Sequence, residues 1–179
     1  MRIALFGGSF DPPHLGHLMA ATHVLATARP DALWILPAAR HPYAKPLTDF
    51  AVRVELCRQA FAVLPQVVVR DDELRNISGF TIDLIEGLAR AHTGHRWLLV
   101  GGTDTAADMP KWKRGAELMN LVEVIAVPRR GYDDANPAAL PAISSTLVRT
   151  RLAAGDPCRD LLPAAVAAAV AAGGWYRQA

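Results

Sequence analysis

Two histidines near the N-terminus, His14 and His17, have the clearest capacity for chemistry in this sequence. They follow a short apolar run, residues 3–6, and the pair Gly7 and Gly8, where the backbone can approach a ligand that a side chain would obstruct. Two consecutive prolines then delay the next helix, so both imidazoles lie at or just before its first turn. Free backbone N–H groups and the positive end of the helix dipole attract anions there. The segment therefore predicts a phosphate site with two additional donors.

Other interpretations of this segment have less support. It contains neither Gly-x-Gly-x-x-Gly nor the Gly-Lys-Ser/Thr of a P-loop, which argues against a dinucleotide-dependent dehydrogenase and a P-loop kinase. The two histidines could bind a metal with Asp11 as a third ligand, but the prolines direct Asp11 away from them. Surface histidines without a role would leave the His-x-Gly-His spacing after a double glycine unexplained. We expect no metal ion held by the protein alone.

A second candidate site lies in residues 143–149, which read Ile-Ser-Ser-Thr-Leu-Val-Arg. Hydroxyl side chains at the start of a helix are ordinary N-caps. Arg149 lies about one turn into that helix, so its guanidinium can turn back toward the free N–H groups. Together with the hydroxyls of Ser144 and Thr146 it can grip a phosphate from several sides. The role of Ser145 stays open, because capping alone would explain it.

Asp104 and Trp112 each allow two interpretations. Asp104 stands in Gly102-Thr103-Asp104, directly after an expected strand, where a carboxylate can accept hydrogen bonds from ribose hydroxyls or help to order hydrated Mg²⁺. It can also simply cap the next helix. Trp112 is flanked by basic residues and is either a half-exposed packing residue or a flat surface on which an aromatic ring stacks.

Short apolar runs alternate with longer amphipathic segments along the chain. We expect strands over residues 2–6, 33–36, 67–70, 97–100 and 122–127, and helices over 15–28, 50–63, 81–91 and 111–120. This alternation predicts an α/β fold with one Rossmann-like, doubly wound parallel sheet, which binds ligands at the carboxyl ends of its strands. A polar loop from residue 128 to 141 precedes two C-terminal helices, over 146–154 and 163–172.

Length and composition narrow the function. With 179 residues, 51% of them hydrophobic, we expect one domain over 1–179, with 143–179 as its C-terminal helical part. The formal net charge of +2 offers no general surface for nucleic acid. The sequence shows no secretory segment or membrane span, and the distant Cys57 and Cys158 are typical of free thiols in a reducing compartment. We therefore expect a cytoplasmic protein that binds small polyanions.

Residues 7–17 resemble the His-x-Gly-His signature of the nucleotidyltransferase superfamily. Within this segment, the sequence Gly-Gly-Ser-Phe-Asp-Pro-Pro-His is most similar to the corresponding segment of the bacterial nicotinate mononucleotide adenylyltransferases. Residues 102–104, Trp112 and 143–149 agree with that family, and the resemblance extends from Arg2 to about Tyr176. It implies transfer of AMP from ATP to nicotinate mononucleotide, which gives nicotinate adenine dinucleotide and pyrophosphate in NAD biosynthesis.

The resemblance also implies roles for individual residues. His14, His17 and Arg149 would be catalytic. The acceptor would be held by the backbone N–H near Thr81 at its carboxylate and by Trp112 at its ring. From the basic character of the loop after the second expected strand, rather than from the resemblance, we expect Lys45 first and His41 second to contact the acceptor phosphate. Mg²⁺ would be carried mainly by the ATP phosphates. The residues expected to bind ATP are Gly7, Gly8, Ser9, Phe10, His14, His17, Gly102, Asp104, Ser144, Thr146 and Arg149.

The expected acceptor loop, residues 41–46, departs from the family pattern. The bacterial nicotinate enzymes more often carry consecutive prolines followed by His and a basic residue, whereas here three residues separate His41 from Lys45. The Tyr-Ala-Lys segment of this loop is somewhat similar to the loop of enzymes that also accept nicotinamide mononucleotide. This compound is therefore an alternative, as the main acceptor or as a second one. A basic loop still suits an acceptor phosphate beside ATP. Arg53 has two possible roles, either as a charge on the helix surface or as another residue that binds phosphate.

The implied reaction needs no general base or covalent intermediate, because the acceptor phosphate is itself an anionic nucleophile that attacks the α-phosphorus in line. Other small adenylyl- or cytidylyltransferases would change the acceptor loop, and a tRNA synthetase needs modules that this length excludes. A non-catalytic nucleotide sensor would be expected to lose His14, His17 or Arg149, which are all present. We expect ATP and nicotinate mononucleotide as partners, without nucleic acid or membrane, and a homo-oligomer is compatible with the sequence.

Overall fold

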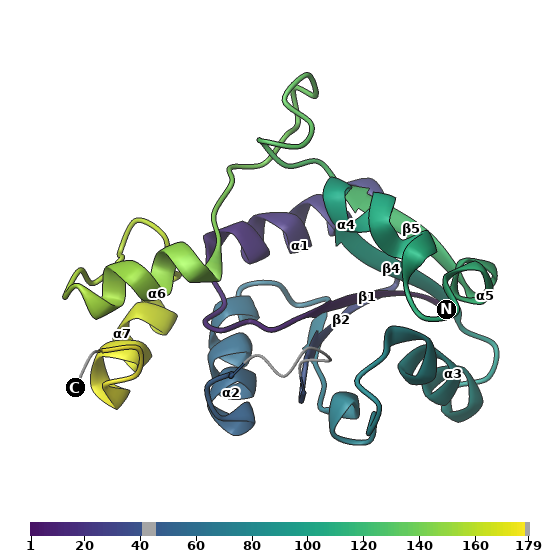
Figure 1. Cartoon of the computed structure of the whole chain (residues 1–179), viewed down its shortest axis with the longest axis horizontal. Helices are drawn as coiled ribbons and strands as arrows, with labels where there is room; N and C mark the ends of the chain where they lie inside the picture. The colour runs from purple at the N-terminus through teal and green to yellow at the C-terminus, as the bar shows by residue number, and fades with distance from the viewer. Residues whose placement is uncertain (41–45, 178–179) are drawn as a thin grey trace.

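A five-stranded parallel sheet forms the centre of the molecule (Figure 1). The computed structural model describes residues 1–40 and 46–177. The strands lie in the order β3-β2-β1-β4-β5, and their bounds are β1 Arg2–Gly8, β2 Ala32–Pro37, β3 Val67–Val69, β4 Arg96–Gly102 and β5 Val122–Val127. Every neighbouring pair is parallel. The predicted doubly wound parallel sheet and all five predicted strand positions are confirmed.

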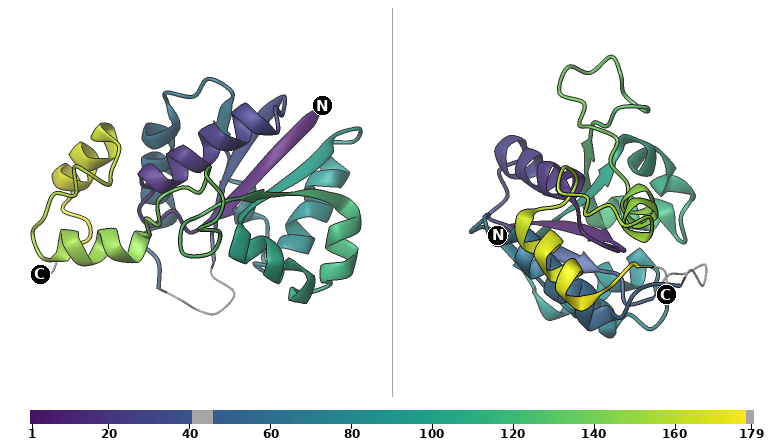
Figure 2. Two further views of the ribbon diagram at one scale, coloured as in Figure 1. Left: turned by 90° about the horizontal axis from the view of Figure 1, so that it is seen from above. Right: turned by 90° about the vertical axis from the view of Figure 1, so that its left-hand side faces the viewer.

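Helices cover both faces of the sheet (Figures 1 and 2). Both faces of the sheet are apolar because successive side chains of a strand point to opposite faces. In β1, Ala4 packs into one hydrophobic core, while Ile3 and Leu5 pack into the other. The first core also receives α1, α2, α6 and α7, and the second receives α3 and α5. The helices are α1 Leu15–Thr27, α2 Phe50–Phe61, α3 Thr81–Ala91, α4 Thr103–Asp108, α5 Gly115–Leu121, α6 Ser145–Ala153 and α7 Ala164–Gly173, with short 3₁₀ turns at Asp72–Leu74 and Met109–Lys111.

The strand order reverses between β1 and β4. The chain leaves β1 toward β2 and β3 on one side and later returns to place β4 and β5 on the other side. Connections then depart in opposite directions from the carboxyl ends of β1 and β4, which leaves a crevice where ligands bind in such sheets. Both strands end in glycine pairs, Gly7 with Gly8 and Gly101 with Gly102. The expected ligand-binding position therefore lies at the switch in strand order.

The segment between β4 and β5 differs from the prediction. A single helix over 111–120 was expected, but α4 begins directly after β4, a 3₁₀ turn follows, and α5 begins only at Gly115. The reason is local. Arg114 adopts a left-handed conformation (φ 52°) that interrupts the helix, and Gly115 packs against the carbonyl oxygens of Met109 and Pro110. Helix α4 is too short to produce a recognisable hydrophobic period.

In the part of the chain that the structure describes, no helix is both long and apolar enough to cross a membrane.

Replacing Gly115 with Ala is expected to lower the free energy of unfolding by about 1–3 kcal/mol, because the new methyl group would meet the carbonyl oxygens of Met109 and Pro110. Gly87→Ala is the matched control, since Gly87 lies inside α3 with open space around it and should gain up to about 1 kcal/mol. Urea denaturation of both variants measures the difference. Equal stability changes would contradict the close packing at Gly115.

Candidate active site

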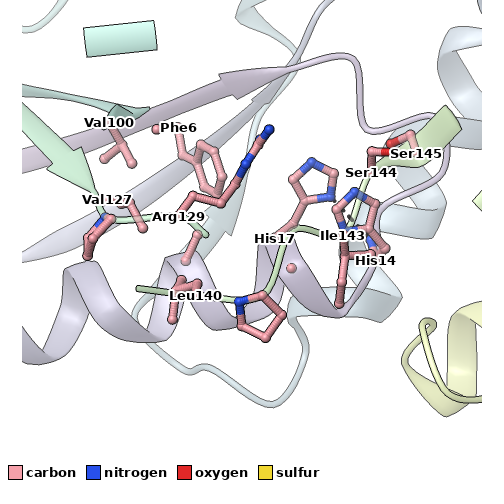
Figure 3. A pocket seen from close by; sticks show the side chains of 15 residues that line it. Phe6, His14, His17, Val100, Val127, Arg129, Leu140, Ile143, Ser144 and Ser145 are labelled. Atoms are coloured by element: carbon pink, nitrogen blue, oxygen red, sulfur yellow. Dashed lines mark hydrogen bonds between the residues drawn. The ribbon is translucent and has the colours of Figure 1, made fainter. Parts of the chain in front are cut away.

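His14 and His17 lie at the start of α1, as predicted. His14 is the N-cap, and His17 is the third residue of the helix. The backbone N–H of His14 donates to Nδ1 of His17 (3.2 Å), and the two rings are stacked with their centroids 3.8 Å apart. Both line a pocket that also contains Ser144 and Ser145 (Figure 3). The structure therefore presents the histidines as one unit facing a cavity.

The surroundings of both imidazoles favour their neutral forms. Burial, with a smaller effect of the Arg129 charge, lowers the pKa of His14 from 6.5 to about 4. Burial, together with His14 and Arg129, places the pKa of His17 well below its ordinary value. Because Nδ1 of His17 accepts a hydrogen bond, its proton lies on Nε2. His17 is therefore a neutral donor whose basicity should rise when a phosphate brings negative charge into the pocket.

Arg129 is a member of this site that the sequence reasoning missed. It follows β5 and lines the same pocket, where its side chain extends between Phe6 and His17 (Figure 3). Its Nε is buried and has no hydrogen-bond partner among the described residues. A buried donor without a partner is costly in a folded protein and suits an incoming anion. Its position directly after a strand, at the ligand edge of the sheet, was the available signal.

The start of α6 reaches across to the histidine loop. Ser144 caps the helix by accepting from the N–H of Leu147 (3.1 Å). Ser145 Oγ donates to the carbonyl oxygen of Pro12 (3.0 Å), and Arg149 Nη1 donates to that of Asp11 (2.6 Å). These bonds give Ser145 a role that the sequence left open, and they place both predicted phosphate motifs in one site.

Thr146 is held by the same guanidinium. Arg149 Nη2 donates to its Oγ1 (3.3 Å), so the planar group joins α6 and the histidine loop at once. The wall of the histidine pocket includes Ser144 and Ser145 but not Thr146 or Arg149, so contact of these two residues with a phosphate stays a prediction.

Buried Arg53 supports the loop from the opposite side. It is 1% exposed, its Nη1 donates to the carbonyl oxygen of Ser9 (2.8 Å), and its Nε donates to that of Thr48 (2.8 Å). Neither open interpretation of Arg53, a surface charge or a phosphate partner, describes this position. Its nearby carboxylate, Asp11, accepts instead from the hydroxyl of Tyr176 (2.8 Å) and the N–H of Thr48 (3.3 Å).

The backbone of the loop after β1 has carbonyls that accept hydrogen bonds and N–H groups without an acceptor among the described residues. The carbonyls of Ser9, Asp11 and Pro12 all accept from side chains of other segments. For the N–H groups of Ser9, Phe10 and Asp11, no acceptor is found among the described residues. The Phe10 ring packs in the core against Phe6 (5.5 Å between centroids), so contact of Phe10 with ATP would come from its backbone. This arrangement suits an anion.

Asp104 lies in the first turn of α4 and does not cap it. Its Oδ1 is buried without a hydrogen-bond partner among the described residues. Asp104 lies between residues that line two different pockets. Gly102 lines the histidine pocket, and Thr105 lines a second pocket. The capping interpretation is therefore wrong, and a role toward a polar ligand stays a prediction.

The second pocket, which we call the acceptor pocket, begins on the other side of β1. Thr81 and Trp112 line it together with Gly7, Gly8 and Ser9. Thr81 is the first residue of α3, whose N-terminus has no side-chain cap. Glu73, Arg40, Phe80, Lys111 and Lys113 also line this pocket and were missed by the sequence reasoning. His41 and Lys45 lie outside the described residues.

No group of three or more His, Cys, Asp or Glu side chains that could hold a metal ion occurs within residues 1–40 and 46–177. The alternative of Asp11 as a metal ligand with the histidines does not fit its contacts, because both of its carboxylate oxygens already accept hydrogen bonds.

Comparison with known proteins identifies relatives over the whole chain. A family model described as cytidylyltransferase-like matches residues 5–151. A probable nicotinate-nucleotide adenylyltransferase of Anaeromyxobacter sp. (strain K) is 43% identical, covering 98% of this chain and 97% of its own. The nicotinate-nucleotide adenylyltransferase of Bacillus subtilis (strain 168) is 32% identical, covering 98% of each.

Solved structures share the fold. The nicotinic acid mononucleotide adenylyltransferase of Plasmodium falciparum, complexed with NaAD, has a TM-score of 0.83 at 18% identity, covering 98% of this chain and 97% of that chain. A putative nicotinate-nucleotide adenylyltransferase of Vibrio parahaemolyticus has a TM-score of 0.79 at 22% identity, covering 99% and 96%. The predicted α/β architecture is thus confirmed.

The neutral His14 predicts a specific pH dependence of stability. Between pH 6.5 and about 4 the unfolded chain binds a proton at this residue and the native protein does not, so the free energy of unfolding falls as the pH is lowered through this window. The contribution of His14 reaches about 1.4 kcal/mol per pH unit. Urea denaturation at several pH values should show a shallower loss in His14→Gln than in the wild type. Parallel curves would contradict a neutral, buried His14.

Proposed function

The chain belongs to the nicotinate-nucleotide adenylyltransferase family, and on this basis we propose that it transfers AMP from ATP to nicotinate mononucleotide. The products are nicotinate adenine dinucleotide and pyrophosphate, so the enzyme acts in NAD biosynthesis. One observation carries the proposal beyond family membership. Two pockets meet at the carboxyl ends of β1 and β4 and share Phe6 and Val100 in their walls. This is the arrangement that a reaction between two anionic substrates requires.

We assign the histidine pocket to ATP. His14, His17 and Arg129 would neutralise phosphate charge from one side, and Arg149 would do so from α6. Ser144 and Thr146, with the free N–H groups of the loop after β1, would donate further hydrogen bonds. Gly102 allows close approach of the backbone, and the unpartnered Oδ1 of Asp104 suits a ribose hydroxyl or a hydrated cation.

We assign the acceptor pocket to the mononucleotide. Trp112 offers a flat surface for the pyridine ring, and the uncapped N-terminus of α3 at Thr81 offers N–H groups to the ring carboxylate. Lys45 and His41 are proposed for the acceptor phosphate on the basis of sequence. Nicotinamide mononucleotide would use the same phosphate and ring contacts, so it stays as an alternative acceptor.

In the proposed mechanism an oxygen of the acceptor phosphate attacks the α-phosphorus of ATP. The new bond joins the two mononucleotides, and the bond to the β-phosphate oxygen breaks as pyrophosphate leaves. His14 and His17 donate hydrogen bonds where negative charge accumulates, and Arg149 and Arg129 stabilise the same charge. Holding two anions in reacting geometry can supply about 7–11 kcal/mol in favourable intramolecular cases.

Mg²⁺ fits this site as an ion that arrives with ATP. Within the described residues, only Asp104 combines a place at the ligand edge with a buried carboxylate oxygen that has no partner, so it would hold the ion through water. When bound, the ion would offset charge on the phosphates.

Pyrophosphate release tests the proposed function. The purified protein is incubated with Mg-ATP and, separately, nicotinate mononucleotide, nicotinamide mononucleotide or phosphopantetheine. Release with nicotinate mononucleotide is expected. Release with phosphopantetheine alone would overturn the assignment.

His17→Ala should lower kcat by about 100- to 1,000-fold without unfolding the protein, because it removes a donor that stabilises transition-state charge. His14→Ala should have a similar effect. Steady-state kinetics measures the loss, and circular dichroism establishes that the variants remain folded. Near-normal turnover in both folded variants would mean that the histidines do not contact the reacting phosphates.

Arg149→Lys should raise KM for ATP or lower kcat, by about tenfold or more, although the charge is retained. The substitution removes the planar group that bonds to the Asp11 carbonyl and Thr146 at once. Arg151→Lys is the matched control on the same helix, because Arg151 pairs with Asp156 and Asp160 away from the pocket. Kinetics that are equal for the two variants would make Arg149 an ordinary helix residue.

A further inference from the structure

The acceptor pocket contains a carboxyl group that the reaction described above does not use. Glu73 lies in the 3₁₀ turn Asp72–Leu74, is partly buried, and lines the pocket together with Thr81 and Trp112. No salt bridge to Glu73 occurs among the described residues, although its neighbour Asp72 is paired with Arg70 (2.6 Å). A carboxyl in the wall of a ligand pocket, held in place by hydrogen bonds, is a candidate for a specificity group.

Hydrogen bonds join Glu73 to the backbone at the start of α3. Nδ2 of buried Asn76 donates to Oε2 of Glu73 (3.0 Å) and to the carbonyl oxygen of Phe80 (3.3 Å). Ser78 Oγ accepts from the N–H of Phe80 (3.2 Å) and donates its single proton to Oδ2 of Asp83 (2.5 Å). Phe80 directly precedes Thr81, so this network fixes the carboxyl beside the N–H groups proposed to read the acceptor ring.

Burial in the pocket wall favours the neutral form of Glu73. Burial, and to a smaller extent the charge of Asp72, raise the pKa of Glu73 from 4.5 to about 7, although the hydrogen bond from Asn76 opposes the shift. Asp83 on α3 is occupied by Ser78 and by Lys113 (3.1 Å). Among the described residues, the other charged side chains that line this pocket are Arg40, Asp108, Lys111 and Lys113.

The two protonation states of a carboxyl interact in opposite ways with the ring carboxylate of one acceptor and the ring carboxamide of the other. A protonated carboxyl donates a hydrogen bond to a carboxylate, whereas an ionised one repels it. An ionised carboxyl accepts a hydrogen bond from a carboxamide. We propose that Glu73 sets the acceptor preference of this enzyme, its neutral form favouring the ring carboxylate of nicotinate mononucleotide and its ionised form favouring the amide of nicotinamide mononucleotide. This inference rests on the proposed function.

The test is the pH dependence of a ratio. The value of kcat/KM is measured for each acceptor from pH 5.5 to 8.5 at saturating Mg-ATP, and the nicotinate value is divided by the nicotinamide value. Titration of the acceptor phosphate and of ATP is common to both reactions and cancels. The wild-type ratio should be constant at low pH and should fall by up to about tenfold per pH unit above 7.

Glu73→Gln supplies the decisive variant. Its amide is neutral at all these pH values and can donate to a carboxylate, so its ratio should vary by less than about twofold across the range. Glu73→Ala should have a lower ratio than Glu73→Gln at pH 6, because the donor is lost. Glu55→Gln, on the exposed surface of α2, is the matched control and should follow the wild type.

Binding provides a second readout that is independent of turnover. Isothermal titration calorimetry at pH 7.5 in two buffers of different ionisation enthalpy measures proton uptake. Nicotinate mononucleotide should draw more protons onto the wild type than nicotinamide mononucleotide does, and this excess should be absent in Glu73→Gln.

The outcomes separate the two proposals. No pyrophosphate release with either acceptor at any pH would refute the proposed function. Release with nicotinate mononucleotide, combined with a wild-type ratio independent of pH or an equal slope in Glu73→Gln, would refute the role of Glu73 alone.

Discussion

The site depends on how the backbone carbonyls between β1 and α1 are satisfied. This loop is neither strand nor helix, and three of its carbonyls accept from Arg53, Arg149 and Ser145, which belong to α2 and α6. Buried carbonyls without partners would destabilise the fold, so these contacts are required for the loop to exist in this form. The N–H groups of Ser9, Phe10 and Asp11 are a separate feature of the loop, since they have no acceptor among the described residues, and they suit an anion.

The electrostatics of the histidine pocket follow from the same packing. The loop and α6 enclose His14 and His17, and burial is the largest cause of their lowered pKa values. Arg129 adds a positive charge, and its Nε has no partner among the described residues. The protein thus gathers donors and positive charge that are poorly compensated without a ligand. Under the proposed function a polyphosphate would supply the missing negative charge, so that affinity and catalysis would share one origin.

Local sequence patterns predicted the parts of this structure that local physics determines. The alternation of apolar runs located every strand, and the glycines and prolines placed the histidines at the start of α1. The contacts of Arg53 and Glu73 were beyond such reasoning, since they depend on partners that folding brings together, whereas Arg129 could have been found from its position just after β5. Arg53, for example, supports a carbonyl 44 positions away. The interruption at Arg114 was missed because a single left-handed residue leaves no periodic signal.

The contacts that hold the loop also determine when it can adopt its final structure during synthesis of the protein. Ribosomes make Asp11 and Pro12 early, whereas their partners follow much later, Ser145 by 133 positions, Arg149 by 138 and Tyr176 by 165. The five strands precede all three of these partners in the chain, so the sheet can pair on a nascent polypeptide before the loop is clamped. A ribosome-bound intermediate would then have its Rossmann-like core without a competent nucleotide site. Under the proposed function, the newly made protein would therefore complete its nucleotide site only after α6 and Tyr176 have emerged and docked.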